Sequence, residues 1–465
     1  NGNSILHSLN HLSEFSLINE AVQLLLRNDI DINEKNRDGK TPLHCAVNST
    51  YPNKGLVNAL VESGADIDAI DYDGNTPMHI AVRNNCAETV DILKLLLAKN
   101  ADINALNHRK ETPLFELLSS YKSTIDNTMI EISEFMLDHG AKIDARNNAG
   151  NTILHAAAEN GRRMRDIERL IESLLKHGAD INCINYAGNT PLHLAVKSYQ
   201  LDAVEFLIAN KARTNIKNYD GFTPIELAIR LFWNEAAEFF INNIDINSKD
   251  AIDIFRFAVE KNNVAVIKIL ESKGFDVKKQ YDEFNTLELA IEHNANEVAK
   301  LFIDDIDVAS PYAERLFRIA ATHSNPYIVE FFAKKGINVN AGDENGNTAA
   351  HLAVGNCAKA FKDLRENRQD LEETTLKILG IIKQFNGDFS LTNNQGIMPI
   401  QLALSNEDML PLLNSTISYI INTYKKQGEQ LLMKCEEIAD LCSKQFSSYP
   451  EMKSVVSFLV RQYAT

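Results

Sequence analysis

Residues 178–208 read GADINCINYAGNTPLHLAVKSYQLDAVEFLI, and the same order of features recurs along the chain. Gly178 follows an apolar helical run, a place where a left-handed glycine closes a helix. Gly188 supplies a second left-handed position, as a tight turn needs. Thr190 and Pro191 begin the next helix, because threonine caps free N–H groups and proline at the first helical position loses no hydrogen bond. The stretch predicts a turn followed by two short helices.

One such unit cannot bury its apolar face alone, so it must stack on copies of itself. The copies keep their register and begin at Gly39 (GKTPLHCA), Gly74 (GNTPMHIA), Glu111 (ETPLFELL), Gly150 (GNTILHAA), Gly221 (GFTPIELA), Gly346 (GNTAAHLA) and Gly396 (GIMPIQLA), with a worn copy at Gly2 (GNSILHSL). This pattern resembles the ankyrin repeat, which has the signature T-P-L-H-x-A and a period of about 33 residues. The resemblance implies an all-α ankyrin-repeat solenoid of about twelve helix-turn-helix units with short β-hairpin-like connectors.

The repeats predict a solenoid over residues 1–404. Units eight to ten, about 245–336, lose the TPLH motif but keep both helical periods, and their connectors IDINSKD and IDVASP are too short for a full hairpin. Residues 405–465 hold three amphipathic runs, which predict a C-terminal helical cap or a separate small helical domain. Extra residues are expected between the two helices of four units, at 48–54, 119–127, 161–166 and 356–370.

Composition narrows the classes of partner. The net charge of −16 argues against nucleic acid and against an anionic membrane surface. No apolar run approaches the roughly 20 residues of a membrane helix, and no signal peptide opens the chain. Six cysteines without a CxxC pair fit a reducing, cytoplasmic compartment. We expect a monomer; the sequence opens inside a repeat, which leaves open whether residues precede it.

Histidine and cysteine are the candidate catalytic and metal-binding residues. Six histidines occupy the fourth place of the TPLH-type motif, and the resemblance implies that these rings bond to the turn and to the neighbouring repeat. No metal-ligand spacing is present, so no metal or cofactor is expected. Cys86 and Cys357 are placed in turns between helices, partly exposed, where pairing with His79 or His351 would make a thiol hydrolase. We expect no enzyme, with this thiol hydrolase as the alternative.

The resemblance also implies where a partner binds. In ankyrin-like stacks the contact positions flank the turn glycine and follow the apolar triplet of the first helix, on the concave side. Mapped onto this sequence, the candidate partner-binding residues are Arg37, Lys40, Tyr72, Asp73, Arg83, Arg109, Tyr186, Lys197, Tyr219, Phe222 and Arg230. Asn75, Glu111 and Asn189 fall at equivalent positions. Trp233 is added as either an exposed anchor or a local core residue, with core favoured. The tip tyrosines could instead only shield the turns.

These features predict a scaffold or adaptor that binds a protein on its concave face. The repeats could also be the targeting region of a larger or enzyme-associated protein. The Asn-, Ile- and Lys-rich composition resembles effectors that intracellular bacteria deliver into host cells, and to a lesser degree poxvirus ankyrin proteins; this favours a host protein as the partner. Asn104 and Asn182 resemble sites of a host asparagine hydroxylase. The identity of the partner, the organism, and the roles of residues 356–370 and of the C-terminal helices stay open.

Overall fold

The computed structural model describes residues 2–11, 15–48, 53–119, 127–160, 167–279, 281, 284–362 and 368–403. In these ranges the chain is helical and forms no strand, and its one isolated β-bridge joins Tyr281 to Phe284. The chain divides into two compact units, Asn1–Asn243 and Ile244–Thr465. The predicted C-terminal cap at 405–465 lies outside the described residues.

The first unit holds seven repeats, each with a first and a second helix, and the first helix of repeat one is a 3-10 helix. The first helices of repeats one to seven are η1 (Leu6–His11), α2 (Pro42–Val47), α4 (Pro77–Asn84), α6 (Pro113–Ser119), α8 (Ile153–Glu159), α10 (Pro191–Lys197) and α12 (Pro224–Arg230). The second helices are α1 (Phe15–Arg27), α3 (Lys54–Glu62), α5 (Thr89–Leu97), α7 (Asn127–Asp138), α9 (Ile167–Lys176), α11 (Leu201–Ala209) and α13 (Asn234–Asn242).

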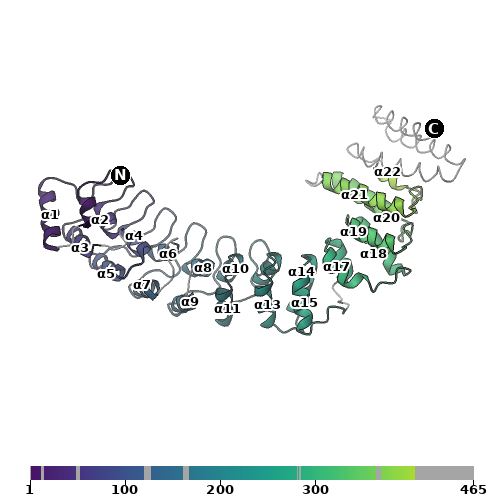
Figure 1. The fold of residues 1–465 in the computed structure, drawn as a ribbon, viewed down its shortest axis with the longest axis horizontal. Helices are drawn as coiled ribbons and strands as arrows, with labels where there is room; N and C mark the ends of the chain where they lie inside the picture. Colours follow the sequence, from purple (N-terminus) through teal and green to yellow (C-terminus); the bar gives the residue numbers. More distant parts are fainter. Residues whose placement is uncertain are drawn as a thin grey trace, which may run out of the picture. The chain divides into compact units, whose positions relative to one another are not determined.

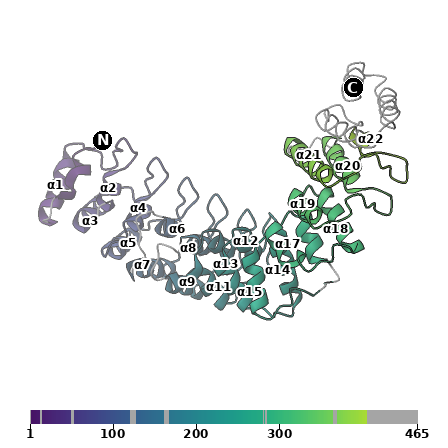
Figure 2. The same cartoon turned by 45° about the vertical axis from the view of Figure 1, so that its right-hand side comes forward.

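In this unit, helices of the same kind in consecutive repeats pack on each other. Each first helix contacts the next first helix, and each second helix contacts the next second helix, so that two rows of helices run side by side (Figures 1 and 2). Leu192, Ala195 and Val196, the predicted apolar face of α10, have no exposed surface. Burying a leucine or valine side chain fully stabilises the fold by about 2 kcal/mol. The array is therefore held by apolar layers between consecutive repeats, as the sequence predicts.

The local signals that define a repeat are confirmed in repeat six. Gly178 and Gly188 have φ values of +93° and +74°. Thr190 precedes α10 with an extended backbone, and its hydroxyl accepts the N–H of His193 at 3.4 Å. Between Gly178 and Thr190 the chain makes a turn that precedes the first helix α10. The corresponding turn before any first helix is called a tip below. In this tip Asn185 donates its N–H to the carbonyl of Asn189 at 2.9 Å.

The second unit continues the two-helix pattern in modified form. Its helices are α14 (Lys249–Glu260), α15 (Val264–Ser272), α16 (Thr286–Glu292), α17 (Asn296–Ile303), α18 (Pro311–Thr322), α19 (Pro326–Lys334), α20 (Ala349–Lys362), α21 (Arg368–Gln384) and α22 (Pro399–Ala403). The short connectors before α14 and α18 are confirmed. In each, a serine N–H bonds to an aspartate carbonyl three residues earlier at 3.0 Å, and the same serine then caps a helix of 12 residues.

The insertions fall largely outside the described residues. The last one is partly visible, because α20 runs through Gly355 and Asn356 to Lys362. The charged stretch after the repeat motif thus begins as an extension of the first helix. This places Cys357 within a helix, and its predicted place in a turn between helices is wrong. Gly355 is tolerated there because the helix around it is packed: Val354 and Cys357 have no exposed surface.

Candidate partner-binding surface

Each tip is built around one asparagine or aspartate side chain. In repeat six the Oδ1 atom of Asn185 accepts the N–H groups of Ala187 and Asn189, both at 2.9 Å, which folds the backbone into the turn. The Nδ2 atom of Asn185 donates to Oδ1 of Asn151 in the preceding repeat at 2.8 Å. Four equivalent amide pairs join other tips: Asn36 to Asn3, Asn107 to Asn75, Asn218 to Asn189 and Asn393 to Asn347. Side-chain amides therefore link these consecutive tips, and the pairs Asn107–Asn75 and Asn218–Asn189 are buried.

Backbone bonds join the tips at their outer ends. Tyr72, Tyr186 and Tyr219 each donate their N–H to a carbonyl of the preceding tip, at 3.3, 3.1 and 3.1 Å. Their side chains stay 67%, 66% and 73% exposed. Each ring also lies against the turn glycine of the preceding tip: a Cβ atom on Gly150 would lie 2.6 Å from Cδ1 of Tyr186. The tyrosines thus shield the turns with one ring edge and present the rest to solvent.

The motif histidines join each first helix to the tip of the next repeat. In His155 the Nδ1 atom accepts the N–H of Thr152 at 3.2 Å, so the proton is on Nε2, which donates to the carbonyl of Asn189 at 2.9 Å. The same pair of bonds is made by His7, His44, His79, His193 and His351. Burial lowers the pKa of His155 to about 4, although the bond to Asn189 opposes the shift. The predicted double bonding of these rings is confirmed.

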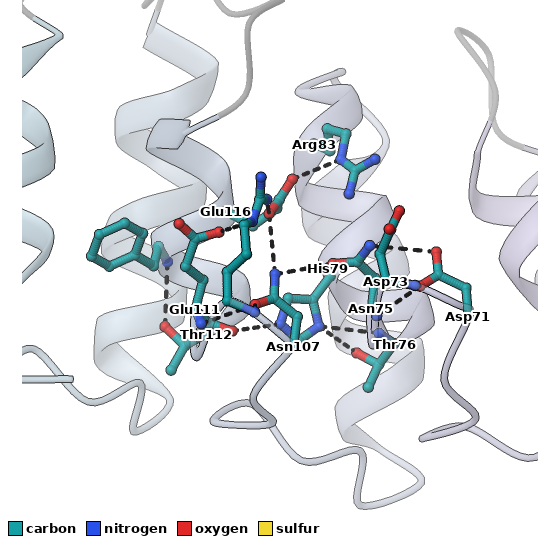
Figure 3. Close-up of polar contacts among 12 residues, drawn as sticks. Asp71, Asp73, Asn75, Thr76, His79, Arg83, Asn107, Glu111, Thr112 and Glu116 are labelled. Carbon is teal, nitrogen blue, oxygen red and sulfur yellow. Dashed lines mark hydrogen bonds and ion pairs between the residues drawn. The ribbon is translucent and has the colours of Figure 1, made fainter. Parts of the chain in front are cut away.

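Two predicted arginines, Arg83 and Arg109, belong to a charged cluster between repeats three and four, and Figure 3 shows Arg83 beside Glu116. The buried carboxylate of Glu116 lies 2.8 Å from Nε of Arg83 and 2.6 Å from Nη2 of Arg109. Nε of Arg109 also lies 2.8 Å from Oε2 of Glu111. Burial raises the pKa of Glu111; Arg109 opposes this shift and the Glu116 charge adds to it. The charges of Arg83 and Arg109 are thus neutralised within the protein, although Arg109 keeps 59% of its side chain exposed.

Most of the other predicted residues lie on the tips or at the ends of first helices. Arg37, Asp73, Lys197 and Arg230 are exposed, and Lys40 and Phe222 are half-buried. The guanidinium of Arg230 lies over the ring of Phe222, 4.7 Å from its centre. These side chains are accessible on the tips and first helices of repeats two to seven.

Three positions that the motif placed on the contact surface are buried instead. Asn75, Glu111 and Asn189 are 1%, 6% and 9% exposed. The amides of Asn75 and Asn189 accept hydrogen bonds from Asn107 and Asn218 of the following tips, and Glu111 pairs with Arg109. At these three sites the position after the turn residue therefore serves the contact between repeats, and the assignment of Asn75, Glu111 and Asn189 to a partner surface is wrong.

Trp233 lies away from the tips, in the turn between α12 and α13. It is half-buried, and its ring is 5.3 Å from the ring of Tyr199 in the corresponding turn of repeat six. Phe232 beside it is 58% exposed. Trp233 thus packs across neighbouring repeats at the C-terminal end of α12, whereas the tips precede the first helices.

The cysteine–histidine pairs expected for a thiol hydrolase do not form. Both ring nitrogens of His79 bond elsewhere, to Thr76 and to the carbonyl of Glu111. Cys357 is buried, contrary to its predicted exposure, and burial raises its pKa to about 11. The sulfur of Cys86 instead lies 3.3 Å from the hydroxyl of Thr89.

A different cysteine does approach a histidine. Sγ of Cys183 is 3.7 Å from Nδ1 of His155, but that nitrogen already accepts the N–H of Thr152. Burial raises the pKa of the Cys183 thiol, which disfavours the nucleophilic thiolate. In the described part of the chain, no three metal-ligating side chains come together. Nor does any described helix have the length and apolar character to cross a membrane.

Sequence reasoning missed two features of this surface. Glu116 stands where repeats three and six have Ile80 and Leu194, so an acid at an otherwise apolar motif position was the available signal. The amide pairs between tips had a signal as well, since asparagine recurs at two fixed places around the turn glycine. Asn104 and Asn182 make a further link between repeats: their Oδ1 atoms accept the N–H groups of Lys142 and Arg213, both at 2.8 Å.

Comparison with known proteins agrees with this geometry. The model of the ankyrin repeats (3 copies) family matches residues 13–107, 89–182 and 163–250, which together span just over half of the 465 residues. The chain belongs to the ankyrin-repeat family. An ankyrin repeat protein of fowlpox virus (strain NVSL) is 26% identical over 113 residues, which are 24% of this chain and 27% of that protein. The chain therefore aligns with little more than a quarter of that relative.

Among solved structures, the chain is similar to the ankyrin repeat domain of Bcl-3, described as a unique member of the IkappaB protein family. The identity is 28% and the TM-score 0.41, and the match covers 49% of this chain and 94% of that one.

Proposed function

We propose that the chain is a non-enzymatic scaffold that binds a partner protein along the tips and first helices of repeats two to seven, the side that ankyrin proteins use. Ankyrin repeats imply a protein-binding role in general, and the tip tyrosines support this particular surface. Tyr72, Tyr186 and Tyr219 expose about two thirds of their surface while a backbone bond and a glycine contact hold each in place. Exposed aromatic rings that lose little conformational freedom on binding are typical interface anchors.

The decisive variant changes the three rings without removing the contacts that they make with the turns. His108 lies against Gly74 just as the tyrosines lie against their glycines, with Cδ2 2.7 Å from a Cβ built on Gly74. The triple substitution Tyr72→His, Tyr186→His and Tyr219→His should therefore keep the tips folded while changing the exposed surface. The control changes three exposed apolar residues away from the tips: Leu17→Ala, Leu24→Ala and Leu301→Ala.

Proximity labelling in animal cells, with a biotin ligase fused to the chain, provides the readout. The triple histidine variant should lose the proteins that the original chain labels specifically, and the leucine control should retain them. Both variants should melt within a few degrees of the original chain. An unchanged set of labelled proteins for the histidine variant would show that the tips are not the binding surface.

We extend the proposal to a host-cell protein as the partner, with the chain acting as an effector. The composition supports this role, as it resembles that of pathogen ankyrin proteins, and the similarity to a fowlpox virus protein gives weight to the viral group beside the bacterial one. We expect the same partner to be labelled in several host cell types. We expect no partner to be labelled in lysates that lack host protein. Binding only to a second chain of the pathogen would favour the targeting-region alternative.

The absence of catalysis is part of the same proposal. It is supported by the occupied ring nitrogens of His79 and His351 and by the buried thiol of Cys357. Cys86→Ala is the direct test, because this thiol is the more exposed of the two candidates. Partner binding and every cellular effect of the chain should survive the substitution, and loss of an effect with binding intact would make the chain a thiol enzyme.

A further inference from the structure

The turns between the two helices of repeats six and seven carry exposed aromatic side chains. Tyr199 is 39% exposed and Phe232 is 58% exposed. Both residues have a left-handed backbone, with φ values of +57° and +55°. In the described ranges, four other repeats have a left-handed residue at the same place between their helices, and in each it is small and polar: Asn85, Asn262, Asn294 and Ser324. Repeats six and seven thus place a bulky ring where these repeats place a short side chain.

These aromatic residues are unfavourable for the fold in two ways. A left-handed backbone crowds the side chain of an L-residue, and asparagine tolerates it better than a bulky residue does. Trp233 follows Phe232, and repeats eight and ten have at its position an asparagine whose side chain caps the second helix, whereas α13 begins without such a cap. The ring of Tyr199, 5.3 Å from that of Trp233, offsets part of this loss, but Phe232 leaves more than half of its surface in water. Packing within the chain therefore does not account for Phe232, and a contact with a partner does.

A cation stands two positions before each exposed ring. Lys197 and Arg230 end the first helices α10 and α12, and both side chains are exposed. In the described part of the chain, no carboxylate pairs with either of them. A cation at the C-terminal end of a helix is favoured by the helix dipole, so these charges have a reason within the fold. It is the combination of an unpaired cation with an exposed ring, repeated in two neighbouring turns, that fits an acidic ligand.

The two turns lie side by side and continue the surface proposed above. The contact between their aromatic rings joins them. Lys197 and Arg230 belong to first helices of the proposed binding surface, at the opposite end from the tips. Asp202 and Glu235, both exposed, lie in the first turns of the second helices, three residues after each exposed ring. The charges therefore change sign across the row of rings, from cations on the first helices to acids on the second.

We propose that these two turns bind an acidic peptide segment of a partner protein, with a bulky apolar side chain of the segment on Phe232 and Trp233. The carboxylates of the segment lie on the first-helix side, beside Lys197 and Arg230, because the acids of the second helices repel them. At physiological salt, charges more than about 8 Å apart are largely screened, so the two nearby cations outweigh the net charge of −16. The inference rests on the proposed function in taking the chain as a protein-binding scaffold, and it adds a second surface and a partner chemistry to the tips.

Trp233 is the only tryptophan of the chain, so its fluorescence reports on this surface. The full chain is used to select peptides from a random library displayed on phage, and each enriched peptide, with any tryptophan changed to phenylalanine, is titrated while Trp233 emission is recorded. We expect the peptides that change this emission to carry several acidic residues around one bulky apolar residue, and to bind more weakly as salt is raised. The proposal is wrong if basic or uncharged peptides change the emission instead, or if no peptide does. A change of emission when the chain alone is concentrated would identify a second copy as the occupant and would also overturn it.

Paired substitutions locate the contacts and keep Trp233 as the reporter. Tyr199→Asn with Phe232→Asn gives both turns the residue that repeats eight and nine have at this place, so the fold should survive. The affinity of the selected peptides should fall at least about tenfold, because aromatic anchors dominate such contacts. If this pair folds and binds the peptides as tightly as the unmodified chain, the rings are not the contact.

The charges are tested separately, with the rings left in place. Lys197→Gln with Arg230→Gln should lower the affinity about fivefold, whereas the control pair, Asp202→Asn with Glu235→Gln, should not lower it. Equal affinity for the first pair and the unmodified chain contradicts the proposal, and this comparison decides even if the asparagine pair fails to fold. The tips are tested by labelled cell proteins and these turns by Trp233 emission, so the failure of one proposal leaves the other standing.

Discussion

The ring of Tyr186 lies directly on the backbone of Gly150, so close that a methyl group on the glycine would sit 2.6 Å from Cδ1 and 2.8 Å from the tyrosine nitrogen. The glycine has two reasons to be there, because its φ of +75° also belongs to the left-handed region. The same double requirement holds at Gly188, beneath Tyr219. Exposed aromatic residues on one tip thus dictate glycine on the tip before.

Substitution of this glycine separates the two requirements. Gly150→Ala should destabilise the first unit by about 3 kcal/mol, from the left-handed backbone and the displaced ring together. Gly221→Ala is the matched control, since its φ is +84° but nothing lies within 4 Å of the added Cβ. It should cost only about 1 kcal/mol. Urea unfolding of both variants gives the difference, and equal losses would mean that Tyr186 moves aside freely.

Lys110 provides the reverse experiment. Its left-handed φ of +58° should be relieved by Lys110→Gly, which we expect to stabilise the chain by about 0.5 kcal/mol after the greater freedom of glycine in the unfolded state is subtracted. Lys110→Ala keeps the Cβ atom and should change stability little. Thermal melting of the two variants distinguishes them; a lower melting temperature for the glycine variant would show that the lysine side chain makes a stabilising contact.

The motif histidines predict a loss of stability in mild acid. Burial lowers the pKa of five of them in the folded chain, so between pH 6.5 and the folded pKa the unfolded chain binds more protons; these five are His44, His79, His155, His193 and His351. Their contribution is complete above pH 6.5 and is lost as the pH falls through the lowered pKa of each ring. For His155 alone, a pKa lowered from 6.5 to about 4 corresponds to roughly 3 kcal/mol.

The chain itself offers the control for this titration. At the histidine position of the last motif, Oε1 of Gln401 accepts the N–H of Met398 at 2.6 Å, so an uncharged amide can cap the helix in the same way. His155→Gln should therefore reduce the dependence of the unfolding midpoint on pH between 7 and 5. A slope identical to that of the unmodified chain would assign the pH dependence to other groups.

The charged cluster predicts an asymmetry between its two sides. Removing both cations with Arg83→Ala and Arg109→Ala leaves Glu116 buried and unpaired, which should cost about 3 kcal/mol. Glu116→Leu restores the apolar residue type of the other repeats and leaves the arginines, which are 33% and 59% exposed, to turn toward water. Its cost should be about 1 kcal/mol or less. Chemical denaturation measures both, and a larger loss for the leucine variant would contradict this account.

The regular part of each repeat could be predicted because its signals are local. A threonine cap, a proline at the helix start and a left-handed glycine act within a few residues, and Thr190, Pro191 and Gly188 behave as expected. The predictions were wrong where a contact with a residue distant in the sequence determines burial or secondary structure. Asn189 has a polar, tip-like context, yet it is buried because Asn218 of the next tip bonds to it. Cys357 lies in a helix because packing overrides the weak helix propensity of Gly355 and Asn356.

The bonds between motif histidine and following tip run in one direction along the chain, from each first helix to the repeat after it. A segment that carries its own complete set of partners therefore extends from one tip through the histidine to the end of the next tip, and overlaps the two-helix repeat without coinciding with it. Duplication or deletion of one whole period keeps a tip after every histidine and so leaves every ring with an acceptor. A truncation that ends between a histidine and the next tip removes the acceptor of the last ring. This rule states how recombination can lengthen or shorten the array without loss of the hydrogen bonds between histidines and tips.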